Sequence, residues 1–310
     1  MNRFAAIDIG TNSVLLLVAD RDAAGRFTAV AERSEITRLG QGVDKTKTLA
    51  PEAMETTLKV LERYAAEARE LGATGMVVSA TSAARDSSNG AEFISAAKAR
   101  AGLNVEIISG AEEARLSWAS AFSDFGGQAP LVVLDIGGGS TEFIFGATNG
   151  EISFRHSFDV GSVRMTERHL RTDPPSAGEL AAIDELLVKT FAAVPKASSG
   201  TRMVGVAGTV TTVAAVAHHV TPYDPQLIHG STLTLSEVDA AFTRLASLPT
   251  QLRKTVPGLQ PRRADVIVAG VQVLRAAIKA VGVEQITVSD RGLRWGLLAD
   301  RFGLAAGAKK

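Results

Sequence analysis

The chain has 310 residues, of which 45% are hydrophobic and 21% are charged, and its 33 basic and 33 acidic residues give no formal net charge. The length predicts two domains, and the composition is typical of a soluble globular protein. The neutral balance argues against a nucleic-acid-binding protein, and the absence of cysteine excludes disulfides, thiolate zinc sites and cysteine nucleophiles and indicates a reducing compartment.

The N-terminal sequence predicts a cytoplasmic protein that does not bind a membrane. The apolar run after Arg3 is interrupted by Asp8, which does not fit the apolar core of a signal peptide. The next apolar run, residues 14–19, is far too short to cross a bilayer.

Strands and helices alternate along the first half, which predicts the α/β class. Pro51 suits the first position of a helix, and the apolar residues from Met54 to Leu71 recur at helical spacing. The expected strands cover residues 4–9, 14–19, 27–31, 76–80 and 105–108, and the expected helices begin at residue 51 and cover 111–121.

The second half repeats this alternation after a segment rich in glycine and proline, residues 124–130. We therefore expect a first domain over 1–125, with 300–310 packing back on it, and a second domain over 126–299. Ser236 and Asp239 predict a capping box. The expected strands are 131–136, 203–207 and 285–288, and the expected helices are 177–193, 236–245, 264–281 and 292–302.

An internal repeat is the most informative feature of the sequence. IDIGTNSVLLLVA begins at Ile7 and LDIGGGSTEFIFG begins at Leu134. In this alignment Asp8 corresponds to Asp135, Gly10 to Gly137 and Ser13 to Ser140. Both copies predict a strand, a glycine turn and a second strand, so two related lobes would place these loops facing each other across a cleft.

The two loops have the chemistry of phosphate sites. Glycine allows the backbone N–H groups to approach a ligand, and successive inward N–H groups bind anions. Asp8 and Asp135 would repel a phosphate unless a cation lay between them, which predicts Mg²⁺. A third loop, residues 205–212, enters a helix and suits either an anion at the helix N-terminus or close packing of a strand on a helix.

Other phosphate and hydrolase patterns are absent from the sequence. It has no GxxxxGK[ST], GxGxxG or GxSxG motif, and its five histidines follow no metal-binding pattern. Three basic pairs indicate either a solvated surface or a groove along a chain of phosphates. These pairs are Lys45 with Lys47, Arg253 with Lys254, and Arg262 with Arg263.

Taken in order, the motifs resemble the exopolyphosphatase and guanosine pentaphosphate phosphohydrolase (Ppx/GppA) family. They are AAIDIGTNSV, SATSAARDSSNG, EIISGAEEARLSW, VLDIGGGSTEF, GSVRMTE, GVAGTVTT, RADVIVAG and VSDRGLRWG. The resemblance implies two actin-like (ribonuclease H-like) α/β domains with mixed sheets flanked by helices and a cleft between them. It implies the short, two-domain form of the family, without the extra helical domains of long members, and a homodimer.

The resemblance also implies roles for individual residues. Glu113 would be the general base for the attacking water, and Arg85 would hold the terminal phosphate. Asp8, Asp135 and Glu142 would bind Mg²⁺, with Mn²⁺ as the alternative. The residues implied to contact phosphate are Gly10, Thr11, Asn12, Ser13, Gly137, Gly138, Gly139, Ser140, Thr141, Gly208 and Thr209.

The activity implied is release of terminal phosphate from inorganic polyphosphate, with a preference for short chains. The nearest alternative is removal of one phosphate from pppGpp to give ppGpp, and the sequence does not separate these two substrates. A kinase of the same superfamily and a non-enzymatic sensor of alarmone or polyphosphate are further alternatives. The sequence around Glu113 argues against the kinase, and the complete set of Glu113, Arg85 and both aspartate loops argues against the sensor.

Overall fold

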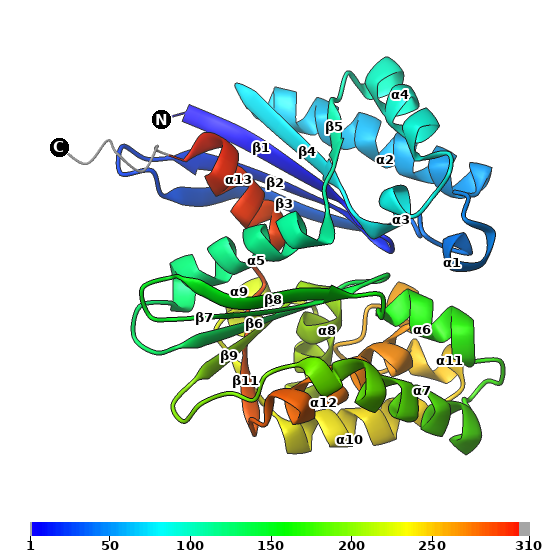
Figure 1. The fold of residues 1–310 in the computed structure, drawn as a ribbon. Helices are drawn as coiled ribbons and strands as arrows, with labels where there is room; N and C mark the ends of the chain where they lie inside the picture. Colours follow the sequence, from blue (N-terminus) through cyan, green and yellow to red (C-terminus); the bar gives the residue numbers. More distant parts are fainter. Residues whose placement is uncertain (1, 304–310) are drawn as a thin grey trace. The chain divides into compact units, whose positions relative to one another are not determined.

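The computed structural model describes residues 2–303. They form two compact units: the first contains the chain up to Leu116 and again from Leu293, and the second is Ser117–Gly292. Each unit has one mixed sheet with helices packed on it (Figure 1), which confirms the predicted α/β class. The domain borders expected at 125/126 and 299/300 stay predictions, and residues 304–310 of the segment expected to pack on the first domain lie outside the described residues.

The first unit contains a five-stranded sheet in the order β3-β2-β1-β4-β5. β1 pairs antiparallel with β2 and parallel with β4, and β4 pairs parallel with β5. Its strands are β1 (Asn2–Ile9), β2 (Ser13–Arg21), β3 (Phe27–Ile36), β4 (Gly75–Ala80) and β5 (Val105–Ile107). Its helices are α1 (Val43–Thr46), α2 (Pro51–Glu70), α3 (Ser82–Arg85), α4 (Gly90–Ala101), the start of α5 (Gly110–Phe125) and α13 (Leu293–Phe302).

Successive residues of β1 point to opposite faces of this sheet, as the two-residue period of a strand requires. Ile7 packs in the cluster that contains Leu61 of α2. Its neighbour Ala6 packs in the cluster that contains Leu116 of α5 and Leu297 of α13. The sheet therefore has an apolar helix layer on each face.

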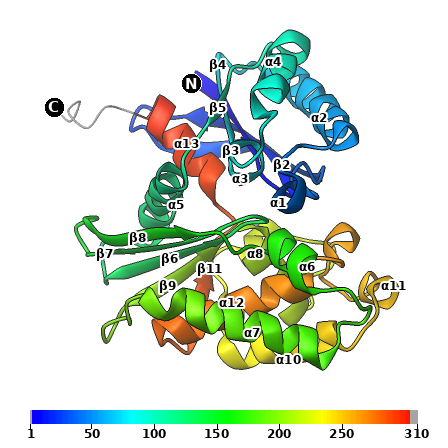
Figure 2. The same ribbon diagram turned by 45° about the vertical axis from the view of Figure 1, so that its right-hand side comes forward.

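The second unit contains a six-stranded sheet in the order β10-β11-β9-β6-β7-β8. Every residue of β6 is buried, as expected for a central strand covered on both faces. Its strands are β6 (Leu131–Ile136), β7 (Thr141–Gly146), β8 (Ile152–Phe158), β9 (Arg202–Val206), β10 (Thr232–Thr234) and β11 (Gln285–Val288). Its longer helices are α6 (Ser162–His169), α7 (Ala177–Thr190), α8 (Ala207–Ala217), α10 (Leu235–Ala246) and α12 (Ile267–Val281), and its short ones are α9 (Pro225–Ile228) and α11 (Thr250–Arg253) (Figure 2).

The internal repeat extends to the topology. In each unit three consecutive strands, β1-β2-β3 and β6-β7-β8, form two antiparallel hairpins, and the next strand of the sheet, β4 or β9, adds in parallel on the other side of the first strand. The repeated sequences therefore occupy the same place in both sheets, at the turn between the first and second strands.

One local prediction is wrong. The capping box of α10 is formed by Thr234 and Glu237, and not by Ser236 and Asp239. Thr234 Oγ1 accepts a hydrogen bond of 3.2 Å from the Glu237 amide, and Glu237 Oε2 accepts one of 2.8 Å from the Thr234 amide. The helix begins at Leu235, so Ser236 already lies inside the first turn.

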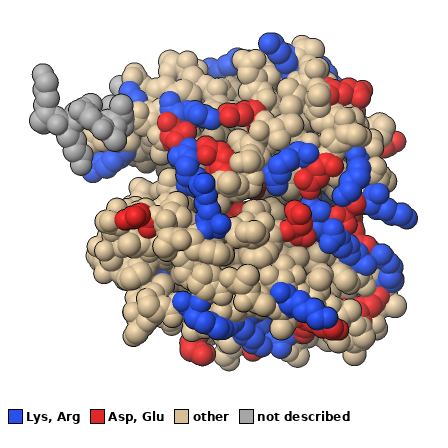
Figure 3. Space-filling model, in the orientation of Figure 1, with Lys and Arg blue, Asp and Glu red and all other residues tan. Residues whose placement is uncertain are grey.

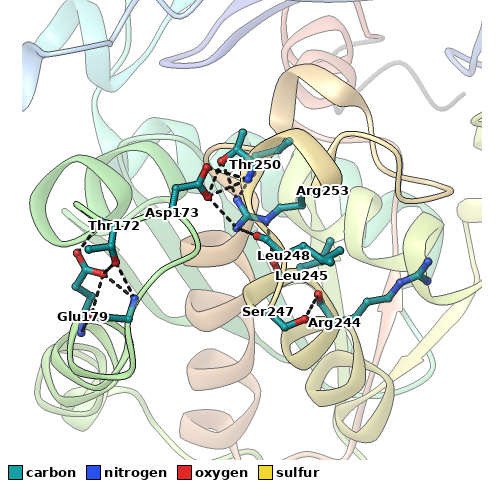
Figure 4. Close-up of polar contacts among 11 residues, drawn as sticks. Thr172, Asp173, Glu179, Arg244, Leu245, Ser247, Leu248, Thr250 and Arg253 are labelled. Atoms are coloured by element: carbon teal, nitrogen blue, oxygen red, sulfur yellow. Dashed lines mark hydrogen bonds and ion pairs between the residues drawn. The ribbon is translucent and has the colours of Figure 1, made fainter.

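Arg253 is not part of a surface pair or a phosphate groove, because it is only 2% exposed. Its guanidinium donates to three backbone carbonyl groups, with hydrogen bonds of 2.6–2.8 Å (Figure 4). Burial lowers its pKa, and the carbonyl oxygens replace the lost water. The acceptors are Leu245, Leu248 and Ala264.

The charged side chains that remain at the surface are mixed in sign. On the face drawn in Figure 3, basic and acidic side chains are interspersed, and many form ion pairs, such as Arg100 with Glu55 and Glu62. No helix in the described part of the chain combines the length and the apolarity that crossing a bilayer requires.

Candidate functional site

In the first unit, three predicted site segments meet at one edge of the sheet. Because β1, β4 and β5 are parallel, their carboxyl ends lie at the same edge. The segments that follow them are the first glycine loop (residues 10–13), α3 and the start of α5. Backbone hydrogen bonds continue the pairing here, from Thr81 to Ile9 at 3.1 Å and from Ile108 to Ala80 at 3.0 Å.

Glu113 and Arg85 are brought together at this edge. Arg85 Nη1 lies 3.5 Å from Glu113 Oε2 and donates to the carbonyl oxygen of Ile108 at 2.9 Å. Glu113 is 8% exposed and belongs to the first turn of α5. A guanidinium has five N–H donors in a planar fork, so Arg85 can hold the carboxylate and still donate to a bound anion.

The first glycine loop is closed and braced from behind. Gly10 N–H donates to Ser13 O at 2.9 Å, which makes a tight turn between β1 and β2. The carbonyl oxygen of Thr11 accepts from Gly40 at 2.8 Å, and that of Asn12 accepts from Thr37 and Arg38 at 3.1 and 3.0 Å. These bonds hold the carbonyl groups of Thr11 and Asn12 against residues 37–40.

Asn12 carries an unsatisfied side-chain amide inside this loop. The residue is 6% exposed, and neither its Nδ2 nor its Oδ1 has a hydrogen-bond partner. A buried polar group without a partner is costly, so the position is suited to a polar ligand. Thr11 Oγ1 instead lies 2.7 Å from Ser82 Oγ of α3, and Asp8 lies in β1 opposite Ser79 of β4.

The second unit presents an equivalent edge. β6, β9 and β11 are parallel, and β6 and β9 are followed by the second glycine loop (residues 137–140) and by α8. Gly137 N–H donates to Ser140 O at 3.0 Å, which repeats the turn of the first loop. Thr141 Oγ1 donates to Val160 O at 2.6 Å, so this hydroxyl braces the loop.

Two carboxylates lie opposite each other below this second loop. Asp135 of β6 and Glu142 of β7 are paired in the antiparallel ladder, and they are 6% and 0% exposed. Asp135 Oδ2 accepts from Ser117 at 2.6 Å, and Glu142 Oε1 accepts from Ser157 at 2.6 Å. Burial raises the pKa of Asp135, and the hydrogen bond from Ser117 opposes that rise.

The third loop, residues 205–212, lies against the side chain of an arginine. Ala207, at the start of α8, has a φ of 69°, which is unusual for a residue with a side chain. A Cβ atom on Gly208 would lie 2.4 Å from the guanidinium of Arg263, so a side chain at this position would displace that guanidinium. Burial lowers the pKa of Arg263. Thr209 is 3% exposed.

Sequence reasoning gave no role to Ser117 or to Arg164, whose backbone and guanidinium contact the second loop. Ser117 follows Glu113 by one helical turn, a spacing that could have drawn attention to it. Among the described residues, no group of three or more histidine, aspartate or glutamate side chains is arranged to hold a metal ion.

Each unit carries the same strand–glycine turn–strand motif at the carboxyl edge of a mixed sheet, an arrangement typical of α/β proteins that bind phosphate groups. A model of the Ppx/GppA phosphatase family matches residues 17–304. The chain belongs to the Ppx/GppA phosphatase family.

Known relatives cover nearly the whole chain. Exopolyphosphatase 2 of Mycobacterium tuberculosis is 38% identical over 98% of this chain and 99% of its own length. The crystal structure of the Aquifex aeolicus Ppx/GppA family member is 34% identical, with a TM-score of 0.81 over 96% of this chain and 97% of that chain. An exopolyphosphatase structure from Cytophaga hutchinsonii is 26% identical, with a TM-score of 0.86 over 96% of both chains.

Proposed function

We propose that this protein is an exopolyphosphatase that hydrolyses the terminal phosphoanhydride bond of inorganic polyphosphate. The observation that carries the proposal is the Arg85–Glu113 pair, 3.5 Å apart at the sheet edge where the first glycine loop lies. The near-full-length similarity to an exopolyphosphatase of Mycobacterium tuberculosis supports the choice of substrate.

In the proposed reaction, Glu113 accepts a proton from a water molecule. The water oxygen attacks the terminal phosphorus, and the bond from that phosphorus to the bridging oxygen breaks. The products are orthophosphate and a polyphosphate chain that is one unit shorter. Arg85 and the N–H groups of the first loop hold the terminal phosphate and stabilise the charge on its oxygens. Positioning and electrostatics supply most of the catalysis in such a transfer.

Asn12 fits this reaction because its buried amide offers both a donor and an acceptor. Nδ2 would donate to a phosphate oxygen, while Oδ1 would accept a hydrogen from a neighbouring water. Ser13 of the same loop would add a further donor.

The second unit supports a site for Mg²⁺ at Asp135 and Glu142. Two buried carboxylates in opposite ladder positions repel each other unless one is protonated or a cation compensates them. Hard oxygen donors suit Mg²⁺, with Mn²⁺ as the alternative. Bound Mg²⁺ would neutralise phosphate charge. Asp8 is the corresponding residue of the first repeat, and a joint role of the two loops stays a prediction, as do the homodimer and the cytoplasmic location.

The decisive experiment measures phosphate release with Mg²⁺ at equal concentrations of terminal phosphate, from long polyphosphate, tripolyphosphate, pppGpp and ATP. Release from both polyphosphates, with ATP and pppGpp slower, is expected. Release of phosphate from pppGpp alone would contradict the exopolyphosphatase proposal and indicate hydrolysis of pppGpp to ppGpp. Binding of polyphosphate without release of phosphate would contradict an enzymatic role.

A further inference from the structure

The three glycines of the second glycine loop are hydrogen-bonded through their carbonyl groups to the start of α6. The amide of Ser162 donates to Gly137 O at 3.0 Å, and the amides of Val163 and Arg164 donate to Gly138 O at 2.9 and 3.0 Å. The guanidinium Nε of Arg164 donates to Gly139 O at 2.7 Å. Three consecutive glycine carbonyl groups are therefore held by one helix.

Peptide geometry fixes where the N–H groups of this loop point. The cis peptide bonds of the described chain lie at 173–174 and 221–222, so the loop peptides are trans and planar. In a trans peptide the carbonyl group of one residue and the N–H of the next point in opposite directions. Because α6 holds the carbonyl groups of residues 137–139, the N–H groups of residues 138–140 point away from α6, as an anion-binding concavity requires.

The carbonyl group of Gly139 is held by the side chain of Arg164, whereas the equivalent carbonyl group in the first unit is held by backbone amides. The residue equivalent to Gly139 in the repeat is Asn12, whose carbonyl oxygen accepts from two backbone amides. In the second unit the guanidinium takes that place. Its side chain is only 8% exposed, and a charge-assisted hydrogen bond of 2.7 Å is stronger than a neutral one.

The lack of a side chain at Gly161 allows α6 to approach the second glycine loop closely enough for the Arg164 hydrogen bond. A Cβ atom on Gly161 would lie 2.6 Å from the carbonyl group of Gly138, so a side chain there would push α6 away from the loop. The bond also polarises the peptide that joins Gly139 to Ser140, because a cation at the carbonyl end increases the positive charge at the N–H end.

We propose that Arg164 is a positioning residue, which orients the Ser140 amide and the neighbouring loop amides toward substrate phosphate. The proposal rests on the proposed function for its substrate. It assigns to Arg164 no direct contact with phosphate.

The test compares Arg164→Met and Arg164→Lys with a control, Arg168→Met, which removes an exposed arginine from the same helix. With tripolyphosphate as substrate, we expect KM to rise about ten-fold in Arg164→Met, the size of effect expected when one hydrogen bond to a charged group is lost. The pH profile of kcat should not move, because Glu113 is untouched. Arg164→Lys, which keeps a charged donor, should recover part of the loss.

A direct measurement on the wild-type chain keeps the test independent of folding and of activity. In ¹⁵N NMR spectra, the amides of Gly138, Gly139 and Ser140 should shift on addition of inorganic phosphate or tripolyphosphate, and the shifts should need higher concentrations in Arg164→Met or Arg164→Lys.

Unchanged KM with a lower melting temperature in both Arg164 variants would reduce Arg164 to a structural role and overturn the proposal. Wild-type amides that do not respond to either anion would also overturn it. Amides that respond in a protein that releases no phosphate would instead contradict the proposed function and leave the positioning role standing.

Discussion

Arg85 Nη1 and Glu113 Oε2 lie 3.5 Å apart, although 28 residues separate them in the chain. Arg85 ends the short helix after β4, and Glu113 belongs to the first turn of the helix after β5. The parallel register of these two neighbouring strands brings the helices together. The pair combines a cation suited to phosphate with a carboxylate suited to accept a proton from water.

Glu113→Gln should lower kcat for polyphosphate by about a hundred-fold or more and change KM little, because the amide cannot accept a proton. Steady-state phosphate release measures both constants. Glu112→Gln is the matched control, since Glu112 lies in the same helical turn and pairs with Arg115, and its activity should remain near that of the wild type. Near-normal turnover of Glu113→Gln would remove Glu113 as the base.

Asp135→Asn should raise the Mg²⁺ concentration for half-maximal activity at least about ten-fold, because it removes one of two opposed carboxylates. Mn²⁺ binding followed by electron paramagnetic resonance gives a readout independent of turnover and should weaken in parallel. Glu151→Gln, which changes an exposed side chain of the same unit, serves as the control. Equal Mn²⁺ affinity in all three proteins would contradict this metal site.

Arg253→Met should destabilise the second unit by about 3 kcal/mol, because three buried carbonyl groups lose their donor. Thermal unfolding should show a melting temperature lower by several degrees. Lys254→Met, at the neighbouring exposed position, should change it little. Equal melting temperatures for the two variants would show that the Arg253 contacts contribute no net stability.

Glu179 should make the free energy of unfolding of the second unit depend on pH in the acidic range. Hydrogen bonds from Thr172 and Ser176 lower the pKa of Glu179 from 4.5 to about 2. A carboxyl group with a lowered folded pKa contributes stability above its unfolded pKa and loses it as the pH falls toward the folded value. Glu179→Gln should therefore be less stable than the wild type at pH 7, and the difference should narrow between pH 4.5 and 2. Urea unfolding at several pH values tests this, and a difference independent of pH would contradict it.

Several features of the fold and the site followed from the sequence alone. The alternation of strands and helices predicted the α/β class, and the two aligned motifs predicted turns that close in the same way, Gly10 to Ser13 and Gly137 to Ser140. These features are accessible because periodicity and turn chemistry depend on residues close together in the chain. The prediction of the capping box was wrong by two residues. Thr234 and Ser236 are both of a residue type that caps helices, and only the position at which the helix begins distinguishes them.

Tertiary structure alone decided which distant residues meet. From the sequence, Arg253 was expected to lie at a solvated surface or in a phosphate groove, yet it is buried among carbonyl groups. Arg164 lies 25 residues from Gly139 in the chain, and nothing local to either residue predicts their hydrogen bond. Strand register and helix packing set such contacts, and they depend on the whole sheet. The sequence by itself therefore determined the class of fold and the residues available for chemistry, while the packing of helices against parallel strand ends decided which of those residues lie close together.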